Sequence, residues 1–379
     1  MLEWKLIRLG DICVKNKNSY SSRDNWKFVN YLDTGSLTEN KITELQYINI
    51  ETDKIPSRAR RKVIKNSILY STVRPNQLHY GIIKEPVDNL LVSTGFTVID
   101  VDTNKAIPEF IYYLLTQNNT TEQLQAIAEQ SVSTYPSIKP SDIENLEFKL
   151  PNLIIQNKIV SILDTIDSKI CQNEKINNNL EQQISVLYQS WFETFDLTDG
   201  VCPGSWSNQE LSTIAEISSG KRPPIKAESC SKETPIPIVG AASVMGFTSE
   251  SNHTDKILVT GRVGTHGIVQ RFNTPCWTSD NTLVIKSTYY EFTNQILQRI
   301  DYSAMNRGST QPLITQGDIK KVSVLVPDTE TLAKFETFAG TMMNQWEANK
   351  QENVKLASLR DTLLPKLMSG ELDVSDIQL

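Results

Sequence analysis

The sequence predicts an α+β (mixed α/β) protein in which two globular domains of similar fold are separated by an antiparallel pair of long coiled-coil helices. Three observations predict this fold. Residues 131–192 recur at 307–368 without insertion or deletion, and both copies carry a long heptad pattern. The segments before them alternate short β-type runs with turn residues. A chain built from two copies of one unit can fold about a pseudo-two-fold axis and present two related surfaces.

Each copy has a first part of variable length and a second part of fixed length. A shift of 176 positions places Ser133 on Ser309. Further upstream Trp4 corresponds to Trp206, a shift of 202. The upstream parts therefore differ by insertions and deletions, as expected for two recognition modules joined by a constant spacer.

Residues 1–151 are predicted to form the first globular domain. Runs of β type lie at 67–73 and 90–101, and a helical stretch lies at 108–115 with a continuation at 124–128.

Residues 152–196 are predicted to form the first spacer helix. Its seam positions alternate in steps of three and four: Leu163, Ile166, Ile170, Asn173, Asn177, Leu180, Ile184, Leu187 and Trp191. This is the a/d pattern of a coiled coil. One helix over 154–192 would be roughly 58 Å long at ~1.5 Å per residue.

Residues 197–327 are predicted to form the second globular domain, and its first residues belong to a glycine- and proline-containing linker at 196–206. Its β-type runs lie at 236–239, 256–260 and 282–285, and a helical stretch lies at 292–300. Residues 328–379 supply the second spacer helix and a C-terminal tail. The second seam is Ala339, Met342, Trp346, Asn349, Asn353, Leu356, Arg360, Leu363 and Leu367.

Asparagine recurs at the same place in both seams. In an antiparallel pair about a pseudo-two-fold axis, Asn173 would face Asn353 and Asn177 would face Asn349. Buried asparagines at seam positions lower stability but fix helix register and orientation. The alternative is that they form a solvated gap where the helices diverge.

Large apolar residues also lie beside the seams. Phe192 on the first helix and Leu364 on the second are examples. We expect them to contact either the globular domains or another protein, and we assign them as candidate residues of a partner interface.

Composition places the chain among globular proteins, with 39% hydrophobic and 22% charged residues. The longest apolar runs fall short of the roughly 18 residues of a membrane span, and the N-terminus does not resemble a signal peptide, so a cytoplasmic location without a membrane partner is expected. Five scattered cysteines argue against a disulfide framework and a zinc site. The net charge of −6 lies mainly in the helical segments. Local basic patches for DNA remain possible, but strong nonspecific DNA affinity is not expected.

Motifs of the common catalysts are missing from the sequence. It contains no Walker loop, no Rossmann glycine fingerprint and no His-Glu-x-x-His. It also has no Asn/Asp-Pro-Pro-aromatic motif of amino-methyltransferases. We therefore expect no catalytic residue and no metal site. The glycine-rich run at 261–267 could hold a phosphate, but after a β-type run it more often forms a tight turn.

Basic and amide side chains gather in the predicted turns of both variable parts. Arginine can bind guanine bidentately, and asparagine or glutamine can bind adenine in the major groove. Each residue could equally be an ordinary solvated charge, and only the recurrence of the group in both copies favours a DNA site. The candidate DNA-binding residues are Arg58, Arg60, Arg61, Lys62, Arg74, Asn76, Gln77, His79, Tyr135, Lys221, Arg222, Arg262, His266, Arg307, Thr310 and Gln311.

Five segments resemble those of one known family. They are LVSTGFTVI (91–99), STYPSIKPSDIENLEFKLP (133–151), LYQSWFETFD (187–196), GSTQPLITQGDIKKVSVLVP (308–327) and LASLRDTLLPKLMSGEL (356–372). On these segments the chain resembles, over essentially its whole length, the specificity (S) subunit of type I restriction-modification systems.

The resemblance implies two target recognition domains, each binding one half of a bipartite, asymmetric site on double-stranded DNA. It also implies two modification subunits that bind S-adenosylmethionine and methylate adenine at N6. Restriction subunits would add ATP- and Mg²⁺-dependent translocation and cleavage. The second copy has SDNT (279–282) in place of STGF (93–96), so the two domains are expected to bind different sequences.

Two other functions remain open on the sequence alone. One is a two-headed coiled-coil adaptor that binds only proteins. The other is a self-contained DNA methyltransferase with diverged motifs.

Overall fold

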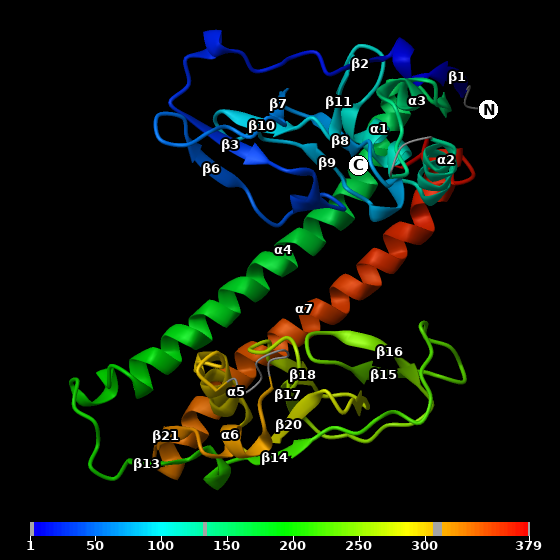
Figure 1. Ribbon diagram of the computed structural model, residues 1–379. Coiled ribbons are helices and arrows are strands. Elements are labelled where there is room, and N and C mark those ends of the chain that lie inside the picture. The colour runs from blue at the N-terminus through cyan, green and yellow to red at the C-terminus, as the bar shows by residue number, and fades with distance from the viewer. Residues whose placement is uncertain (1–3, 132–134, 306–312, 378–379) are drawn as a thin grey trace. The chain divides into compact units, whose positions relative to one another are not determined.

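The computed structural model describes residues 4–131, 135–305 and 313–377 (Figure 1). Helices and strands are both present, and the predicted mixed α+β class is confirmed. Within these residues no helix is long and apolar enough to cross a membrane.

The chain forms two compact units. One comprises Met1–Cys171 and Glu352–Leu379, and the other comprises Gln172–Gln351. The boundary passes through both long helices, α4 (Leu153–Phe192) and α7 (Thr329–Ser369). Each unit therefore contains one globular domain and one half of each helix. The predicted boundaries at 151 and 327 lie shortly before α4 and α7 begin, and the one at 196 lies shortly after α4 ends. Each half of a long helix packs on a globular domain.

The globular domain of the first unit contains one sheet with the strand order β6–β3–β10–β7 and another with the order β2–β11–β8–β9. The predicted run 90–101 is divided between them, because the chain turns at Thr94 and Gly95. Strands β1 and β12 form a separate pair, as do β4 and β5. The strands are β1 (Lys5–Arg8), β2 (Cys13–Lys15), β3 (Phe28–Leu32), β4 (Leu37–Thr38), β5 (Lys41–Ile42), β6 (Gln46–Asn49), β7 (Ala59–Lys62), β8 (Ser67–Ser71), β9 (Tyr80–Ile83), β10 (Leu90–Ser93), β11 (Phe96–Val101) and β12 (Glu147–Leu150).

The second globular domain repeats this topology. The order β14–β20–β17–β18 and its antiparallel pairing repeat β2–β11–β8–β9, and β16–β15–β19 repeats β6–β3–β10. Strands β13 and β21 pair as β1 and β12 do. In the described part of the second unit, no strand corresponds to β7. The strands are β13 (Ser207–Glu210), β14 (Glu216–Ser219), β15 (Ile236–Val239), β16 (Val244–Thr248), β17 (Ile257–Gly261), β18 (Gln270–Phe272), β19 (Trp277–Thr278), β20 (Thr282–Lys286) and β21 (Ser323–Val326).

Short helices complete each globular domain and contribute to its core. They are α1 (Pro108–Leu115), α2 (Asn118–Glu129) and α3 (Pro140–Glu144) in the first unit, and α5 (Tyr290–Arg299) and α6 (Gln316–Lys320) in the second. Phe110 of α1 and Phe292 of α5 hold equivalent positions and are fully buried. The core of the first unit also takes in Leu163 of α4 and Leu367 of α7, so both long helices pack on the domain.

In each unit a side chain of a long helix accepts hydrogen bonds at the N-terminus of a domain helix. Gln156 of α4 accepts the backbone N–H of Ile107, just before α1, at 2.9 Å. Glu336 of α7 accepts the N–H groups of Glu291 and Phe292 in α5 at 3.1 and 2.8 Å. These N–H groups have no partner within their own helices, so the long helices satisfy them.

The long helices run antiparallel in both units, as predicted. In the second unit Asn349 donates to the Oδ1 atom of Asn177 at 2.9 Å, and Asn177 donates to the carbonyl of Trp346 at 3.1 Å. In the first unit Asn353 donates to the carbonyl of Ile170 at 3.4 Å. The predicted meeting of Asn177 and Asn349 is thus present, and Asn173 is fully buried. The pairing of Asn173 with Asn353, and the control of register by all four asparagines, stay predictions.

Of the two expected roles for Phe192 and Leu364, contact with a globular domain is present in the structure, and their place in a partner interface stays a prediction. Phe192 is 5% exposed, and its ring lies 4.9 Å from that of Phe292 and 5.1 Å from that of Phe335, centroid to centroid. Leu364 is half-buried against the core of the first unit. The globular domains cover the helix flanks that the heptad pattern alone leaves open. Large apolar residues that do remain exposed on the helices are Ile154, Ile176, Val186, Phe338, Val354 and Leu359.

Candidate nucleic-acid interface

In the first unit, the turn between β10 and β11 joins two loops that carry candidate residues. The backbone N–H of Thr94 donates to the carbonyl of Arg58 at 2.9 Å. The carbonyl of Gly95 accepts from both the N–H and the hydroxyl of Thr72, at 2.8 and 2.9 Å. The segment before β7 and the loop after β8 therefore form one continuous surface.

The loop after β8 presents an arginine stacked on an aromatic ring. Arg74 has a left-handed backbone (φ 48°), and its N–H donates to the carbonyl of Pro136 at 2.9 Å. Its guanidinium lies 4.9 Å from the centroid of the Tyr135 ring, which is 55% exposed. No carboxylate of a described residue pairs with Arg74, so its donors remain available. A guanidinium held in this way can bind a guanine edge bidentately.

The structure divides the basic run at 58–62 into different roles. Lys62 forms an ion pair with Asp24 and lies over the ring of Trp26, so it is occupied within the domain. Arg61 is half-buried, and burial lowers its pKa. Its Nη2 donates weakly to Thr94, and its buried Nη1 finds no acceptor among the described residues. Arg60 donates to its own loop at Ser57.

Arg58 and the amides near Arg74 are exposed, whereas the histidine of that loop is tied down. Nδ1 of His79 lies 2.7 Å from the carbonyl of Leu37 and 3.0 Å from the hydroxyl of Thr38. Asn76 and Gln77 are exposed and lie in the short helical turn that follows Arg74. His79 therefore supports the loop, and the exposed residues are the ones placed to contact a ligand.

The second unit has the same loop framework with different side chains. The N–H of Arg262 donates to the carbonyl of Asn281 at 2.8 Å, as that of Thr72 does to Gly95. The N–H of Ile314 donates to the carbonyl of Arg262 at 3.0 Å, and the N–H of Ile138 donates to that of Thr72 at 2.9 Å.

Glycines allow the second loop to turn more tightly than the first. Gly264, which holds the position of Arg74, also has a left-handed backbone (φ 82°). A Cβ on Gly261 would lie 1.9 Å from the carbonyl oxygen of Thr265, so no other residue fits there. The run 261–267 is a tight turn rather than a phosphate cradle, which is the outcome that its strand-like flank favours.

Arg262 and His266 each leave a buried nitrogen without a hydrogen-bond partner in the described part of this unit. Nδ1 of His266 lies 3.2 Å from the carbonyl of Gly261, but its Nε2 has no protein partner. The Nε atom of Arg262 is likewise buried and without one. Nε of Arg262 is a donor, whereas Nε2 of His266 accepts when Nδ1 donates to the carbonyl of Gly261. Buried polar groups of this kind require partners, and a base edge carries both donors and acceptors.

Lys221 and Arg222 form the other exposed part of this surface. The N–H of Lys221 donates to the carbonyl of Thr278 at 2.9 Å, and the indole of Trp277 donates to the carbonyl of Lys221 at 2.8 Å. Both basic side chains are exposed. The candidates Arg307, Thr310 and Gln311 lie outside the described residues.

Sequence reasoning missed Thr94, Trp277 and Asn281, which hold these loops together. The replacement of STGF by SDNT marks two of these three positions, since both motifs form the turn before the central strand. Their backbone role could be recognised only once the loops that they join were known.

Among the described residues, no three His, Cys, Asp or Glu side chains cluster as metal ligands. A small cavity in the second unit is lined by Arg271, Tyr290, Glu291 and Trp346. Its arginine and glutamate already pair bidentately at 2.6 and 2.7 Å, which leaves neither group free for acid–base work.

Comparison with known proteins gives consistent matches along the chain. The family described as type I restriction modification DNA specificity domain matches residues 1–182 and 203–355. The HindI type I restriction enzyme specificity subunit of Haemophilus influenzae is 24% identical over 98% of this chain and 100% of its own length. The MjaIX specificity subunit of Methanocaldococcus jannaschii is 23% identical over 98% of this chain and 94% of its own.

A solved structure supports the same fold. The S subunit of a type I restriction-modification system from M. genitalium has a TM-score of 0.62 and 18% identity, and the match covers 99% of this chain and 97% of that one. Since two family matches cover most of the sequence, each including one of the globular domains described above, the chain belongs to the type I restriction-modification DNA specificity family.

Proposed function

We propose that this chain is the noncatalytic specificity subunit of a type I restriction-modification complex and that it recognises a bipartite, asymmetric site on double-stranded DNA. The observation that carries the proposal is the pair of equivalent loop surfaces, one around Arg74 and Tyr135 and the other around Arg262 and His266. Each presents arginine at a loop held by the same backbone hydrogen bonds. Their different side chains would give the two half-sites different sequences.

Two modification subunits would bind S-adenosylmethionine and methylate adenine at N6, and restriction subunits would supply ATP- and Mg²⁺-dependent cleavage. In this proposal the chain contributes target recognition and a scaffold, and its partners contribute the chemistry. The near-neutral globular domains fit a protein whose DNA affinity depends on a few specific contacts more than on bulk charge.

The test is to assemble the chain with modification subunits and to sequence the DNA that the complex methylates. We expect one asymmetric bipartite motif carrying N6-methyladenine, and DNA binding that weakens as salt concentration rises. Methylation by the isolated chain would instead identify a self-contained methyltransferase. An assembled complex with no salt-dependent DNA binding would identify a protein adaptor.

A further inference from the structure

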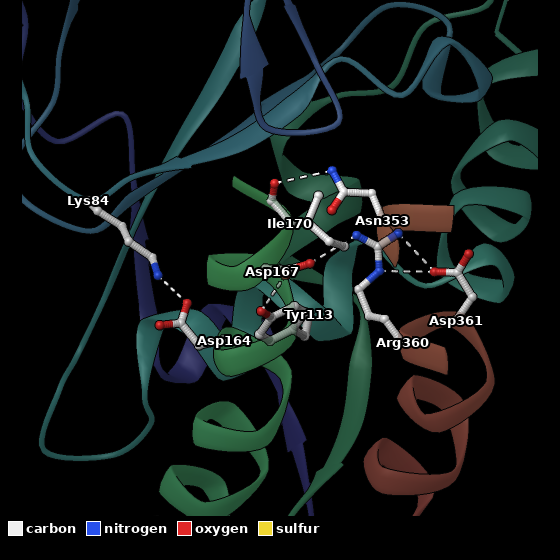
Figure 2. Close-up of polar contacts among 8 residues, drawn as sticks. All are labelled: Lys84, Tyr113, Asp164, Asp167, Ile170, Asn353, Arg360 and Asp361. Atoms are coloured by element: carbon white, nitrogen blue, oxygen red, sulfur yellow. Dashed lines mark hydrogen bonds and ion pairs between the residues drawn. The ribbon is translucent and has the colours of Figure 1, made fainter. Parts of the chain in front are cut away.

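A single carboxylate in the first unit joins three elements. Oδ2 of Asp167 accepts the hydroxyl of Tyr113 at 2.7 Å, and its Oδ1 accepts Nη1 of Arg360 at 3.0 Å (Figure 2). Tyr113 belongs to α1 of the globular domain, Asp167 to α4 and Arg360 to α7. We call these three residues the Asp167 cluster.

Both donors of the cluster keep their protons. Burial raises the pKa of Tyr113 above its usual value, and the charge of Asp167 raises it further. Burial alone would lower the pKa of Arg360, but its bonds to Asp167 and Asp361 outweigh that effect. Arg360 also donates to Oδ1 of Asp361 through Nε and Nη2 at 3.0 and 2.9 Å, and Figure 2 shows this second carboxylate on the side away from Tyr113.

The fold does not need a polar pair at this place. Arg360 occupies a seam position, where a coiled coil favours an apolar side chain. The shift of 176 positions relates the pair Asp167–Arg360 to Met343–Ile184 in the second unit. Met343 and Ile184 are 7% and 1% exposed and lie in one apolar core. The equivalent positions of the other unit are therefore filled by apolar side chains.

Polar and apolar pairs differ in how strictly they fix geometry more than in how much they stabilise the fold. The Asp167–Arg360 pair is partly buried, with each side chain 32% exposed. Replacing even a fully buried ion pair by packed apolar residues is often neutral or stabilising. Hydrogen bonds, however, require defined distances and angles, whereas hydrophobic burial is non-directional. Because Asp167 bonds to the domain through one oxygen and to α7 through the other, it adds directional contacts that involve both helices, whereas Gln156 and Asp164 bond the domain to α4 alone.

We propose that Asp167 is a positioning residue that fixes the first recognition domain on the helix pair and thereby limits the DNA spacer that the complex accepts. This inference rests on the proposed function. One base pair advances ~3.4 Å and rotates by about 35° along the duplex. Since α4 continues without a break to Phe192 in the second unit, a domain that pivots on the helix would tolerate spacers that a fixed domain rejects.

The test transplants the apolar pair of the second unit into the first. The double variant Asp167→Met with Arg360→Ile is assembled with modification subunits. Methylation rates are then measured on duplexes with unchanged half-sites and with spacers of native length, one base pair shorter and one longer. We expect the preference for the native spacer to fall by about tenfold, while the melting temperature stays at or above that of the wild type. Unchanged spacer preference in a folded double variant would overturn the proposal.

Two single variants complete the experiment. Tyr113→Phe removes the hydroxyl that joins the domain to Asp167 and leaves the Asp167–Arg360 pair in place. It should therefore relax the spacer preference in the same direction, and it provides a test even if the double variant fails to assemble. Asp361→Asn removes the neighbouring charge and leaves the cluster bonded, so it should keep the native preference. Equal relaxation by Asp361→Asn, or none by Tyr113→Phe, would also overturn the proposal. Failure of the wild-type complex to methylate any bipartite site would instead refute the proposed function.

Discussion

The two units attach their domain helices to the long helices with different chemistry. In the first unit a neutral amide, Gln156, accepts the N–H group at the start of α1, and the Asp167 cluster ties α1 to both long helices. In the second unit an ionisable carboxylate, Glu336, accepts two N–H groups of α5. The shift of 176 makes Val160 the equivalent of Glu336. The two residues that accept these N–H groups, Gln156 and Glu336, therefore come from positions one helical turn apart. Helix length and pairing are preserved between the copies, while the contacts that orient each domain are not.

The loop surfaces differ in the same manner. Backbone hydrogen bonds at Thr72 and Arg262 are equivalent, but the first loop has Arg74 where the second has Gly264. The first unit also carries β7 with its basic run. The comparison teaches that a constant backbone framework can support two surfaces with independent side-chain chemistry.

The largest expected effect tests that independence. Replacing residues 205–327 with the corresponding domain of a related protein should change one half-site completely and leave the other unchanged, because each domain would contact its own stretch of major groove. Sequencing of methylated DNA measures both halves at once. A change in both half-sites would show that the two surfaces act together.

The cap chemistry predicts a pH dependence confined to the second unit. Burial raises the pKa of Glu336 from 4.5 to about 7, although the two N–H donors oppose this. A raised pKa means that the folded state binds the proton of Glu336 more tightly than the unfolded state does. The protonated carboxyl group therefore contributes fully to the free energy of unfolding below pH 4.5, and this contribution is lost as pH rises through about 7. This difference corresponds to roughly 3 kcal/mol.

The measurement is chemical denaturation of the wild type and of Glu336→Gln at pH 4.5 and pH 8. From pH 4.5 to pH 8, the free energy of unfolding should fall by roughly 3 kcal/mol more in the wild type than in Glu336→Gln. Gln156→Glu offers the matched control, since it introduces an ionisable cap in the first unit and should add a similar pH dependence there. Identical pH profiles for the wild type and Glu336→Gln would rule out this role.

Substitution of Arg74 should reduce base discrimination at the first half-site by about 2 kcal/mol and leave the second half-site unchanged. Loss of a bidentate base contact costs ~1–3 kcal/mol of discrimination, so Arg74→Ala should relax the first half-site only. Arg74→Lys should not restore it, because lysine lacks the planar pair of donors. Arg60→Ala, which removes an arginine bonded to its own loop, is the control. Competition binding with single-base variants measures the effect, and a uniform loss across all sequences would identify Arg74 as a phosphate contact instead.

The smallest effect concerns the asparagines of the second unit. Asn349→Leu should lower the unfolding free energy by about 1–3 kcal/mol, because it leaves Oδ1 of Asn177 buried without its donor. Leucine at both positions should return stability to within about 1 kcal/mol of the wild type or above it. Thermal denaturation measures stability, and size-exclusion chromatography reports any loss of a single helix register. A double variant that stays monodisperse would favour a purely local role for this polar pair.

The sequence by itself determined the repeat, the helix pair and some of the strands, namely β8, β10, β11, β15, β17 and β20. Residues 154–192 were predicted as one helix and form α4 from 153 to 192, and the run at 236–239 forms β15. These features follow from local periodicity, since a seam with steps of three and four is compatible with little other than a long paired helix.

Only the tertiary structure decided which side chains are available and which are occupied. Lys62 is paired with Asp24, 38 positions away, and Phe192 is covered by Phe292, 100 positions away. Asp167 receives Arg360 from a helix that lies far along the chain. Periodicity shows that a face will be buried or exposed, but it does not identify the distant segment that covers it. The candidate interface and the Asp167 cluster therefore emerge only when the separate segments are brought together by folding.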